Sequence, residues 1–365
     1  MSLPLIHLVA GARPNFMKIA PLFHELKEAD WCRLEIIHTG QHYDYEMSAA
    51  FFQDLGLPDP QVHLGVGSGS HARQTAGVLV AYEEVLLQKQ PAWVVVVGDV
   101  NSTLACTLAA KKLNLKVAHL EAGLRSFDRT MPEEINRLVT DALADLLWTP
   151  SPDGDRNLLH EGVDQGRIER VGNIMIDSFE LLRPRIEAQE TWRGLGLEKG
   201  GYGLLTLHRP SNVDRPQTLT RIVEQLLAVS ERLPLVFPVH PRTRGRLEEA
   251  GLWEQLAGAP GMRLLKPQGY IDFMSLLTGC RLALTDSGGI QEETTYLGIP
   301  CLTLRPNTER PITVSQGTNR LIAPEEIGQA IQRVLAGKSA RGRCPELWDG
   351  HTAQRVAASL RRHLG

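Results

Sequence analysis

Short apolar and β-branched runs recur along the whole chain, and stretches with the spacing of amphipathic helices separate them. The clearest runs lie at residues 6–9, 34–37, 94–97, 116–120, 204–207, 235–238, 282–285 and 301–304. Continuous apolar strands that alternate with helices are typical of a parallel sheet covered on both faces. The alternation therefore predicts an α/β protein built from doubly wound parallel sheets.

Two such domains are expected, because 365 residues exceed the size at which one hydrophobic core usually stops growing. The alternation of strands and helices restarts after a polar, glycine-rich stretch at 192–201. We predict a first Rossmann-like domain over 1–175 and a second over 176–349, facing each other across a cleft. A final helix at about 350–365 is expected to pack back on the first domain.

The overall charge excludes several classes of partner. With 39 Lys and Arg against 42 Asp and Glu, the net charge of −3 gives no broad attraction to nucleic acid or to an anionic membrane. No apolar stretch reaches the roughly 18 residues that suggest a membrane span, and the N-terminus lacks a secretory pattern. We therefore expect a cytoplasmic protein without nucleic-acid or membrane partners.

The five cysteines are scattered along the chain, and no two of them form a C-x-x-C pair. Such spacing argues against a disulfide framework and against a zinc site, and it fits a reducing compartment. No metal site is predicted.

The first strand runs into residues 11–18, which include Gly11, Arg13, Pro14 and Lys18. Glycine permits a tight exit from the strand, proline suits a first helical turn, and cations near a helix N-terminus attract anions. The segment is an anion-binding candidate. Taken alone, it fits equally well with Arg13 and Lys18 as solvated surface charges.

Acidic residues follow the third and fourth apolar runs of the first half. Asp99 comes after the strand at 94–97, Glu121 after the strand at 116–120, and Glu133 lies shortly beyond. Carboxyl ends of parallel strands meet at one edge of a sheet, and a group of carboxylates there can move protons to and from carbon. The alternatives are a helix-capping role for Asp99 and ordinary first-turn helix acidity for Glu133.

The second half carries a strand, then Ser287, Gly288 and Gly289, then a helix with Glu293. Unpaired backbone N–H groups at such a helix start suit a diphosphate, and a carboxylate on the helix suits ribose hydroxyls, so the motif favours a nucleotide-sugar site over a structural turn. His208 and Arg310 follow other strands at the same sheet edge and are candidate anion ligands. For Arg310, an ordinary loop arginine is an equally good interpretation.

Taken together, ordered motifs from Gly11 to Leu321 resemble the non-hydrolysing UDP-N-acetylglucosamine 2-epimerases, which have the GT-B architecture. The motifs are Gly-Ala-Arg-Pro at 11–14, Thr-Gly-Gln-His at 39–42, Gly-Asp at 98–99, Glu-Ala-Gly-Leu-Arg at 121–125, Pro-Glu-Glu-x-Asn-Arg at 132–137, Val-Gly-Asn at 171–173, His-Arg at 208–209, Thr-Asp-Ser-Gly-Gly-Ile-Gln-Glu-Glu at 285–293 and Thr-Glu-Arg-Pro at 308–311.

The resemblance implies a cofactor-free epimerisation at C2 of UDP-N-acetylglucosamine, in which UDP is eliminated, 2-acetamidoglucal forms and UDP adds back. It implies that Asp99, Glu121 and Glu133 handle protons, with His208 also at the reacting end. It further implies a set of substrate ligands: Arg13, Lys18, Arg137, Gln268, Phe273, Ser287, Gly288, Gly289, Glu293 and Arg310. A homodimer and a place in cell-surface polysaccharide synthesis are implied as well.

Two segments depart from the family's commoner pattern, at 208–212 and at 127–131. They leave open activation by a second substrate molecule, and a related substrate such as a 2,3-diacetamido sugar uronate. The competing functions are a hydrolysing epimerase, a GT-B glycosyltransferase, which would need an acceptor groove, and a nucleotide-sugar sensor. Neither of the last two requires the three carboxylates.

Overall fold

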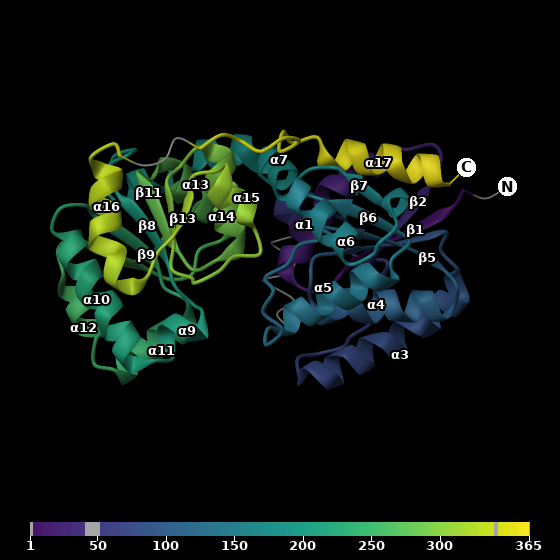
Figure 1. Cartoon of the computed structure of the whole chain (residues 1–365), viewed down its shortest axis with the longest axis horizontal. Helices are drawn as coiled ribbons and strands as arrows, with labels where there is room; N and C mark the ends of the chain where they lie inside the picture. The colour runs from purple at the N-terminus through teal and green to yellow at the C-terminus, as the bar shows by residue number, and fades with distance from the viewer. Residues whose placement is uncertain (1–2, 41–51, 339–341, 365) are drawn as a thin grey trace. The chain divides into compact units, whose positions relative to one another are not determined.

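The computed structural model describes residues 3–40, 52–338 and 342–364, apart from the side chain of Arg13. The chain divides into two compact units, and Figure 1 shows the helices and strands of each. Unit 1 comprises Met1–Leu181 and Glu346–Gly365, and unit 2 comprises Leu182–Pro345. The boundary falls inside one helix, α7 (Ile174–Gln189), slightly later than the sequence-based boundary at 175 and 176.

Unit 1 contains a seven-stranded sheet in the order β3-β2-β1-β4-β5-β6-β7. Its strands are β1 (Leu5–Ala10), β2 (Arg33–His38), β3 (Val62–His63), β4 (Trp93–Val97), β5 (Lys116–Leu120), β6 (Leu146–Thr149) and β7 (Ile168–Arg170). Every pairing is parallel. Strand β4 is buried along its whole length, as its unbroken apolar sequence predicts.

The helices of unit 1 cover both faces of its sheet (Figure 1). They are α1 (Arg13–Leu26), α3 (His71–Lys89), α4 (Asn101–Lys112), α5 (Pro132–Leu143), α6 (Pro152–His160), the first part of α7, and α17 (Thr352–His363). Helix α17 lies beside α1, and the indole Nε1 of buried Trp148 donates to the Ser359 hydroxyl at 2.9 Å. The last helix thus completes the core of unit 1.

Unit 2 contains a six-stranded parallel sheet in the order β10-β9-β8-β11-β12-β13. Its strands are β8 (Gly203–Thr206), β9 (Leu235–Pro238), β10 (Met262–Leu265), β11 (Leu282–Thr285), β12 (Cys301–Thr303) and β13 (Asn319–Leu321). Its helices, in chain order, are α8 (Thr191–Gly194), α9 (Pro210–Val213), α10 (Pro216–Ser230), α11 (Pro241–Glu249), α12 (Trp253–Gly258), α13 (Tyr270–Gly279), α14 (Gly288–Leu297), α15 (Pro311–Ser315) and α16 (Ile327–Leu335).

The predicted α/β class with two parallel, doubly wound sheets is confirmed. All eight apolar runs form strands, whereas β3, β6, β7, β10 and β13 are not among those runs. Three of these five, β3, β7 and β13, are edge strands of two or three residues, too short to show a pattern. Within the described residues, none of the helices combines the length and apolar character that crossing a membrane requires.

Candidate active site

In each unit the strand order reverses at one place in the sheet, and candidate residues of that unit follow the strands on either side of it. In unit 1 the strand order reverses between β1 and β4, and in unit 2 between β8 and β11. Ligands of open parallel sheets bind beyond the carboxyl ends of strands at such a reversal. Asp99 follows β4 in unit 1, while His208 and Ser287 follow β8 and β11 in unit 2.

Asp99 is held by an arginine of α5. The Arg137 guanidinium donates from NH1 to Asp99 Oδ2 at 2.5 Å, and Asn136 Nδ2 donates to the Asp99 carbonyl at 2.8 Å. The N-cap position of α4 is Val100, which has no side-chain hydrogen bond to the helix start. Asp99 is therefore a partly exposed carboxylate in an ion pair with a buried arginine, rather than a helix cap.

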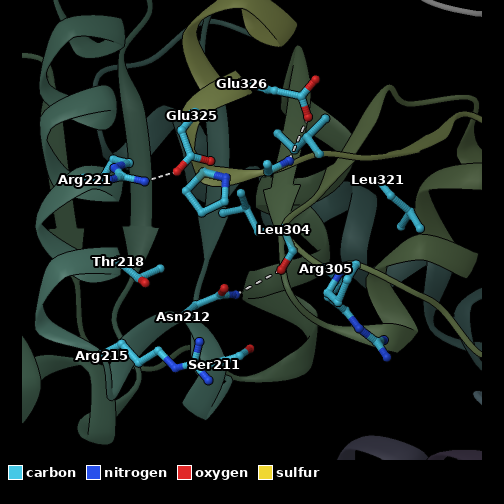
Figure 2. Close-up of a pocket in the computed structure, with 14 residues that line it drawn as sticks. Ser211, Asn212, Arg215, Thr218, Arg221, Leu304, Arg305, Leu321, Glu325 and Glu326 are labelled. Atoms are coloured by element: carbon cyan, nitrogen blue, oxygen red, sulfur yellow. Dashed lines mark hydrogen bonds and ion pairs between the residues drawn. The ribbon is translucent and has the colours of Figure 1, made fainter. Parts of the chain in front are cut away.

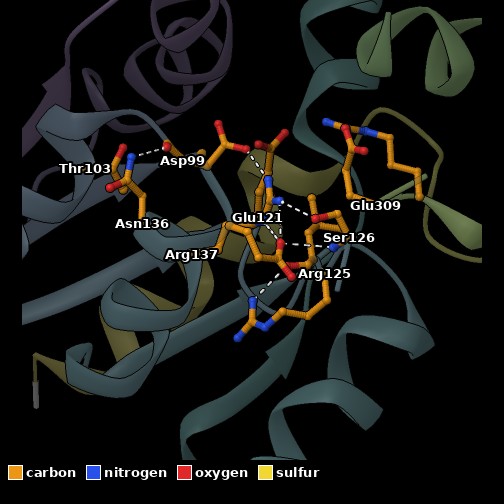
Figure 3. Close-up of polar contacts among 12 residues, drawn as sticks. Asp99, Thr103, Glu121, Arg125, Ser126, Asn136, Arg137 and Glu309 are labelled. Atoms are coloured by element: carbon orange, nitrogen blue, oxygen red, sulfur yellow. Dashed lines mark hydrogen bonds and ion pairs between the residues drawn. The ribbon is translucent and has the colours of Figure 1, made fainter. Parts of the chain in front are cut away.

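Glu121 is a strained, buried carboxylate. Its φ of 71° lies in the left-handed region, which is costly for a residue with a side chain and is concentrated at functional sites. Its Oε2 accepts a short hydrogen bond from Lys18 Nζ. Its Oε1 is buried and has no hydrogen-bond partner among the described residues. Figure 3 shows Glu121 among the polar residues of this part of unit 1.

Lys18 is buried, which contradicts one of the two sequence-based interpretations of its segment. Its ammonium is buried and paired with Glu121, so it is not a solvated surface charge. The positive φ of Gly98 brings that residue so close that a Cβ there would lie 2.9 Å from Lys18 Nζ. Lys18 therefore joins the exits of β1, β4 and β5. The side chain of Arg13, and residues Gln41 and His42 of the Thr-Gly-Gln-His motif, lie outside the described residues.

The buried acidic residue at the start of α5 is Glu134, while Glu133 is exposed. Glu134 accepts from the backbone N–H groups of Ser126 and Phe127 and pairs with Arg137 NH2 at 2.5 Å. Burial alone would raise the pKa of Glu134, but these donors hold the pKa below its ordinary value. Arg137 thus bridges Glu134 and Asp99, and Figure 3 shows its contact with Asp99.

In unit 2, His208 is held by Asp286, a buried carboxylate at the end of β11. His208 Nδ1 lies 3.1 Å from Asp286 Oδ1, and the carboxylate also accepts from the backbone N–H groups of His208 and Arg209 and from Asn212 Nδ2. Burial would raise the pKa of Asp286, but the hydrogen bond and charge of His208 and the backbone donors hold it low. The His208 side chain remains 42 % exposed, so it is positioned yet accessible.

The Ser287-Gly288-Gly289 turn begins α14, as predicted. A Cβ on Gly288 would lie 2.7 Å from both Arg310 NH1 and Glu309 Oε1, whereas one on Gly289 would meet open space. The glycine at 288 therefore permits close approach of the Arg310 guanidinium to the helix start. The space at Gly289 suits a ligand at the α14 N-terminus.

Arg310, whose side chain is only 12 % exposed, belongs to a network of charges, so the interpretation as a surface loop arginine is wrong. Its Nε lies 2.8 Å from Glu292 Oε2, and NH1 donates to Glu309 Oε1 at 2.6 Å. Arg305 pairs with the other oxygen of Glu309 at 2.8 Å. Burial opposes ionisation of Glu309, but the two arginines hold its pKa far below the ordinary range. Arg310 thus faces the α14 turn in a fixed orientation.

Glu293 lies in the interior of α14 and is buried. The Tyr270 hydroxyl donates to Glu293 Oε1 at 3.0 Å. Burial raises the pKa of Glu293 to about 8, despite the Tyr270 hydrogen bond. The carboxyl group therefore retains its proton near neutral pH. Gln268, whose Nε2 donates to the Lys266 carbonyl, and half-buried Phe273 flank Tyr270 in sequence.

Glu293 should make the protein less stable as pH rises from about 4.5 to about 8. A carboxyl group with a raised folded-state pKa stabilises fully below its ordinary value of 4.5, and this contribution is lost as pH rises through the folded pKa. We expect Glu293→Gln to remove that slope. Melting temperatures of the two proteins across this pH range test it, since other groups titrate equally in both. A constant difference between the two curves would contradict it.

Several site residues were not predicted from the sequence, although each lies within a quoted motif. They are Glu134, Asp286, Glu292 and Glu309, the carboxylates that hold Arg137, His208 and Arg310. Each of the four is the direct sequence neighbour of a residue that was predicted. The signal that could have found them is charge balance, because a buried cation requires a nearby anion.

A cavity of about 520 Å³ lies on the α10 side of unit 2, lined by Asn212, Arg215, Arg221 and Arg305 among others (Figure 2). Arg221 pairs with Glu325, and Asn212 donates to the Leu304 carbonyl at 3.0 Å. Of these lining residues, Asn212 also donates to Asp286, and Arg305 also pairs with Glu309. Among the residues with described positions, no group of three or more His, Cys, Asp or Glu could hold a metal ion.

Comparison with known proteins agrees with this geometry. The sequence model of the UDP-N-acetylglucosamine 2-epimerase family matches residues 24–361. A UDP-N-acetylglucosamine 2-epimerase of Methanocaldococcus jannaschii is 40 % identical, over 97 % of this chain and 98 % of its own. A UDP-2,3-diacetamido-2,3-dideoxy-D-glucuronate 2-epimerase of Pseudomonas aeruginosa is 39 % identical, over 96 % and 98 %.

Solved structures give the same result. The M. jannaschii UDP-GlcNAc 2-epimerase in complex with UDP-GlcNAc and UDP superimposes with a TM-score of 0.88 at 39 % identity, over 98 % of this chain and 99 % of that one. Both the family match and this likeness extend over nearly the whole chain. The chain belongs to the UDP-N-acetylglucosamine 2-epimerase family.

Proposed function

We propose that this chain interconverts UDP-N-acetylglucosamine and UDP-N-acetylmannosamine by inverting C2. The observation that carries the proposal is Glu121, a buried carboxylate with a left-handed backbone and one oxygen without a partner, in a chain 40 % identical to an epimerase of that name. Backbone strain of this kind is concentrated at functional sites.

The proposed reaction is an elimination followed by an addition. A carboxylate removes the C2 proton, the bond between C1 and the β-phosphate oxygen breaks, and UDP leaves with the bonding electrons to give 2-acetamidoglucal. UDP then adds back at C1 while a proton is delivered to the opposite face of C2. Asp99, Glu121 and Glu133 are the proposed proton-handling groups. No nicotinamide or metal is required for this sequence of steps.

Unit 2 is proposed to hold UDP. The diphosphate would bind at Ser287, Gly288 and Gly289, where His208 and Arg310 are already held in place by carboxylates. Fixed donors there stabilise the charge that develops as UDP leaves. Glu293 is the proposed ribose ligand, and Gln268 and Phe273 the proposed uracil contacts. Arg13 and Lys18 would act from the exit of β1, with Lys18 acting through Glu121.

Incubation with UDP-N-acetylglucosamine in D₂O tests the proposal. We expect deuterium to appear at C2 and the manno isomer to form without added nicotinamide or metal. Proton NMR measures both changes. A glycosyltransferase or a sensor would leave the C2 proton in place. A hydrolysing epimerase would release free N-acetylmannosamine and UDP. An unexchanged C2 would refute the proposal for this substrate.

A second candidate substrate is a UDP-2,3-diacetamido sugar uronate, because the P. aeruginosa relative of that specificity is 39 % identical. The same exchange measurement with both nucleotide sugars decides between them. The preferred substrate should have the higher kcat/KM for deuterium incorporation.

We also propose a cytoplasmic homodimer. Helix α5 turns polar Glu134, Arg137 and Asp141 inward and leaves Ile135 and Val139 at the surface, and α3 exposes Val80 and Leu87. Exposed apolar side chains on neighbouring helices are typical of a subunit contact. Val80→Glu should shift sedimentation from dimer to monomer, whereas Glu28→Gln should leave it unchanged. A wild-type protein that sediments as a monomer would contradict the proposal.

A further inference from the structure

His119 is a fully buried histidine on β5 that lies between two hydrogen-bond acceptors. Its Nδ1 is 2.6 Å from Asp141 Oδ1, and its Nε2 is 2.8 Å from the Gly98 carbonyl oxygen. A carbonyl oxygen has no hydrogen to donate, and neither does an ionised carboxylate. Both ring nitrogens must therefore carry a hydrogen if both contacts are to be hydrogen bonds.

The surroundings of Asp141 keep it ionised. Its Oδ2 accepts from the Gly123 backbone N–H at 3.0 Å and lies 2.7 Å from Arg125 NH1. Burial opposes its ionisation, but the charge and hydrogen bond of His119, the Arg125 guanidinium and the Gly123 donor hold the pKa of Asp141 below its ordinary value. Arg125 and the Gly123 N–H favour the ionised carboxylate independently of His119, so the proton shared with His119 belongs on the ring.

The guanidinium that faces Asp141 is shared with a second carboxylate. Arg125 is bound through Nε and NH2 to the two oxygens of Glu161, which is exposed, at 2.8 and 2.7 Å. Arg125 therefore offsets only part of the charge of the buried Asp141 carboxylate. A protonated His119 ring supplies a second cationic partner to that carboxylate.

The contact to Gly98 bears directly on Asp99. Gly98 has a φ of 67°, and its carbonyl belongs to the peptide group that leads into Asp99. Helix α5 holds this dipeptide at three places: Arg137 binds the Asp99 carboxylate, Asn136 binds the Asp99 carbonyl, and Asp141 acts on the Gly98 carbonyl through His119. Without the ring donor, the peptide between Gly98 and Asp99 could rotate.

We propose that His119 is a buried imidazolium that positions Asp99 by holding the Gly98 carbonyl in place. It is a positioning residue, since it acts through the Gly98–Asp99 peptide. The inference rests on the proposed function only for the catalytic role of Asp99. Small errors in the placement of a reacting group cost rate rather than affinity, because binding depends on other contacts.

Nitrogen-15 NMR of the histidine-labelled wild-type protein tests the charge. We expect one histidine ring with hydrogens on both nitrogens, as the two hydrogen bonds of His119 require. Asp141→Asn supplies the assignment and the matched comparison: its amide can donate to Nδ1, so a neutral ring can still donate from Nε2 to Gly98. The double protonation should vanish in this variant. A wild-type spectrum without a doubly protonated ring would overturn the proposal, whether or not the protein is active.

Steady-state kinetics test the positioning. His119→Phe removes both donors at similar size, and we expect kcat to fall about 10- to 100-fold while KM and UDP affinity stay within about 2-fold. Asp141→Asn should lose several times less, since it keeps the Gly98 contact. Unchanged kcat in folded His119→Phe, or a parallel loss of kcat, UDP affinity and amide protection, would overturn the positioning role. If His119→Phe does not fold, Asp141→Asn is compared with Asp99→Asn. A fall in kcat that is as large in Asp141→Asn as in Asp99→Asn would then overturn the positioning role.

Discussion

Glu121→Gln is expected to slow deuterium incorporation at C2 by about 10²- to 10⁴-fold, the range that one positioned acid or base supplies. The carboxylate is buried, with Oε2 bound to Lys18 and Oε1 without a hydrogen-bond partner among the described residues. Glutamine has nearly the same shape and can still accept from Lys18. It cannot, however, take up a proton, so only the chemical step should suffer.

Binding separates this result from general damage. UDP affinity measured by calorimetry should stay within about 2-fold of wild type, because the proposed UDP ligands belong to unit 2. Glu28→Gln is a suitable control, since Glu28 is a highly exposed glutamate of the same unit and should retain full activity. An exchange rate for Glu121→Gln above half that of wild type would remove Glu121 from the proton-handling groups.

Gly123→Ala should destabilise unit 1 by roughly 3 kcal/mol, the sum of a left-handed backbone and a steric clash. Gly123 has a φ of 79°, and a Cβ there would lie 2.4 Å from the Gly154 carbonyl oxygen. That oxygen belongs to the backbone of α6 and cannot move independently. The Gly123 N–H also binds Asp141, so the displacement should extend to His119.

Gly162→Ala is the matched control for this effect. Gly162 has a φ of 82°, but a Cβ there would meet nothing within 4 Å. It should therefore cost only the conformational part, about 1–2 kcal/mol. Native-state hydrogen exchange of β5 and β6 amides measures both values within unit 1. Equal losses in the two variants would show that the contact with Gly154 is relieved without cost.

The sequence predicted the apolar strands and the sheet edges well, since these depend on local pattern. Strand β11 and the turn at Ser287 are read directly from the run Leu-Ala-Leu-Thr and the glycines that follow. Asp99, Glu121 and His208 could be placed at carboxyl ends for the same reason. Contacts between residues that are distant in the sequence were not predicted, because spacing alone does not reveal them.

Charge pairing is the part that the sequence did not reveal. Lys18 and Glu121 are separated by 103 residues, and Asp286 and His208 by 78, yet each pair is held together by the order of the strands. The same limit explains Glu133 and Glu134: both stand at the start of α5, and only the three-dimensional structure shows which one is buried.

Helix α17 has a consequence for how the protein is made. Unit 1 consists of Met1–Leu181 together with Glu346–Gly365, and Trp148 of its central sheet bonds to Ser359 in α17. A ribosome therefore synthesises all of unit 2 before the last piece of unit 1 emerges. Unit 1 is begun first and completed second, and during translation its α1 surface stays uncovered until α17, which follows unit 2 in the chain, has been made.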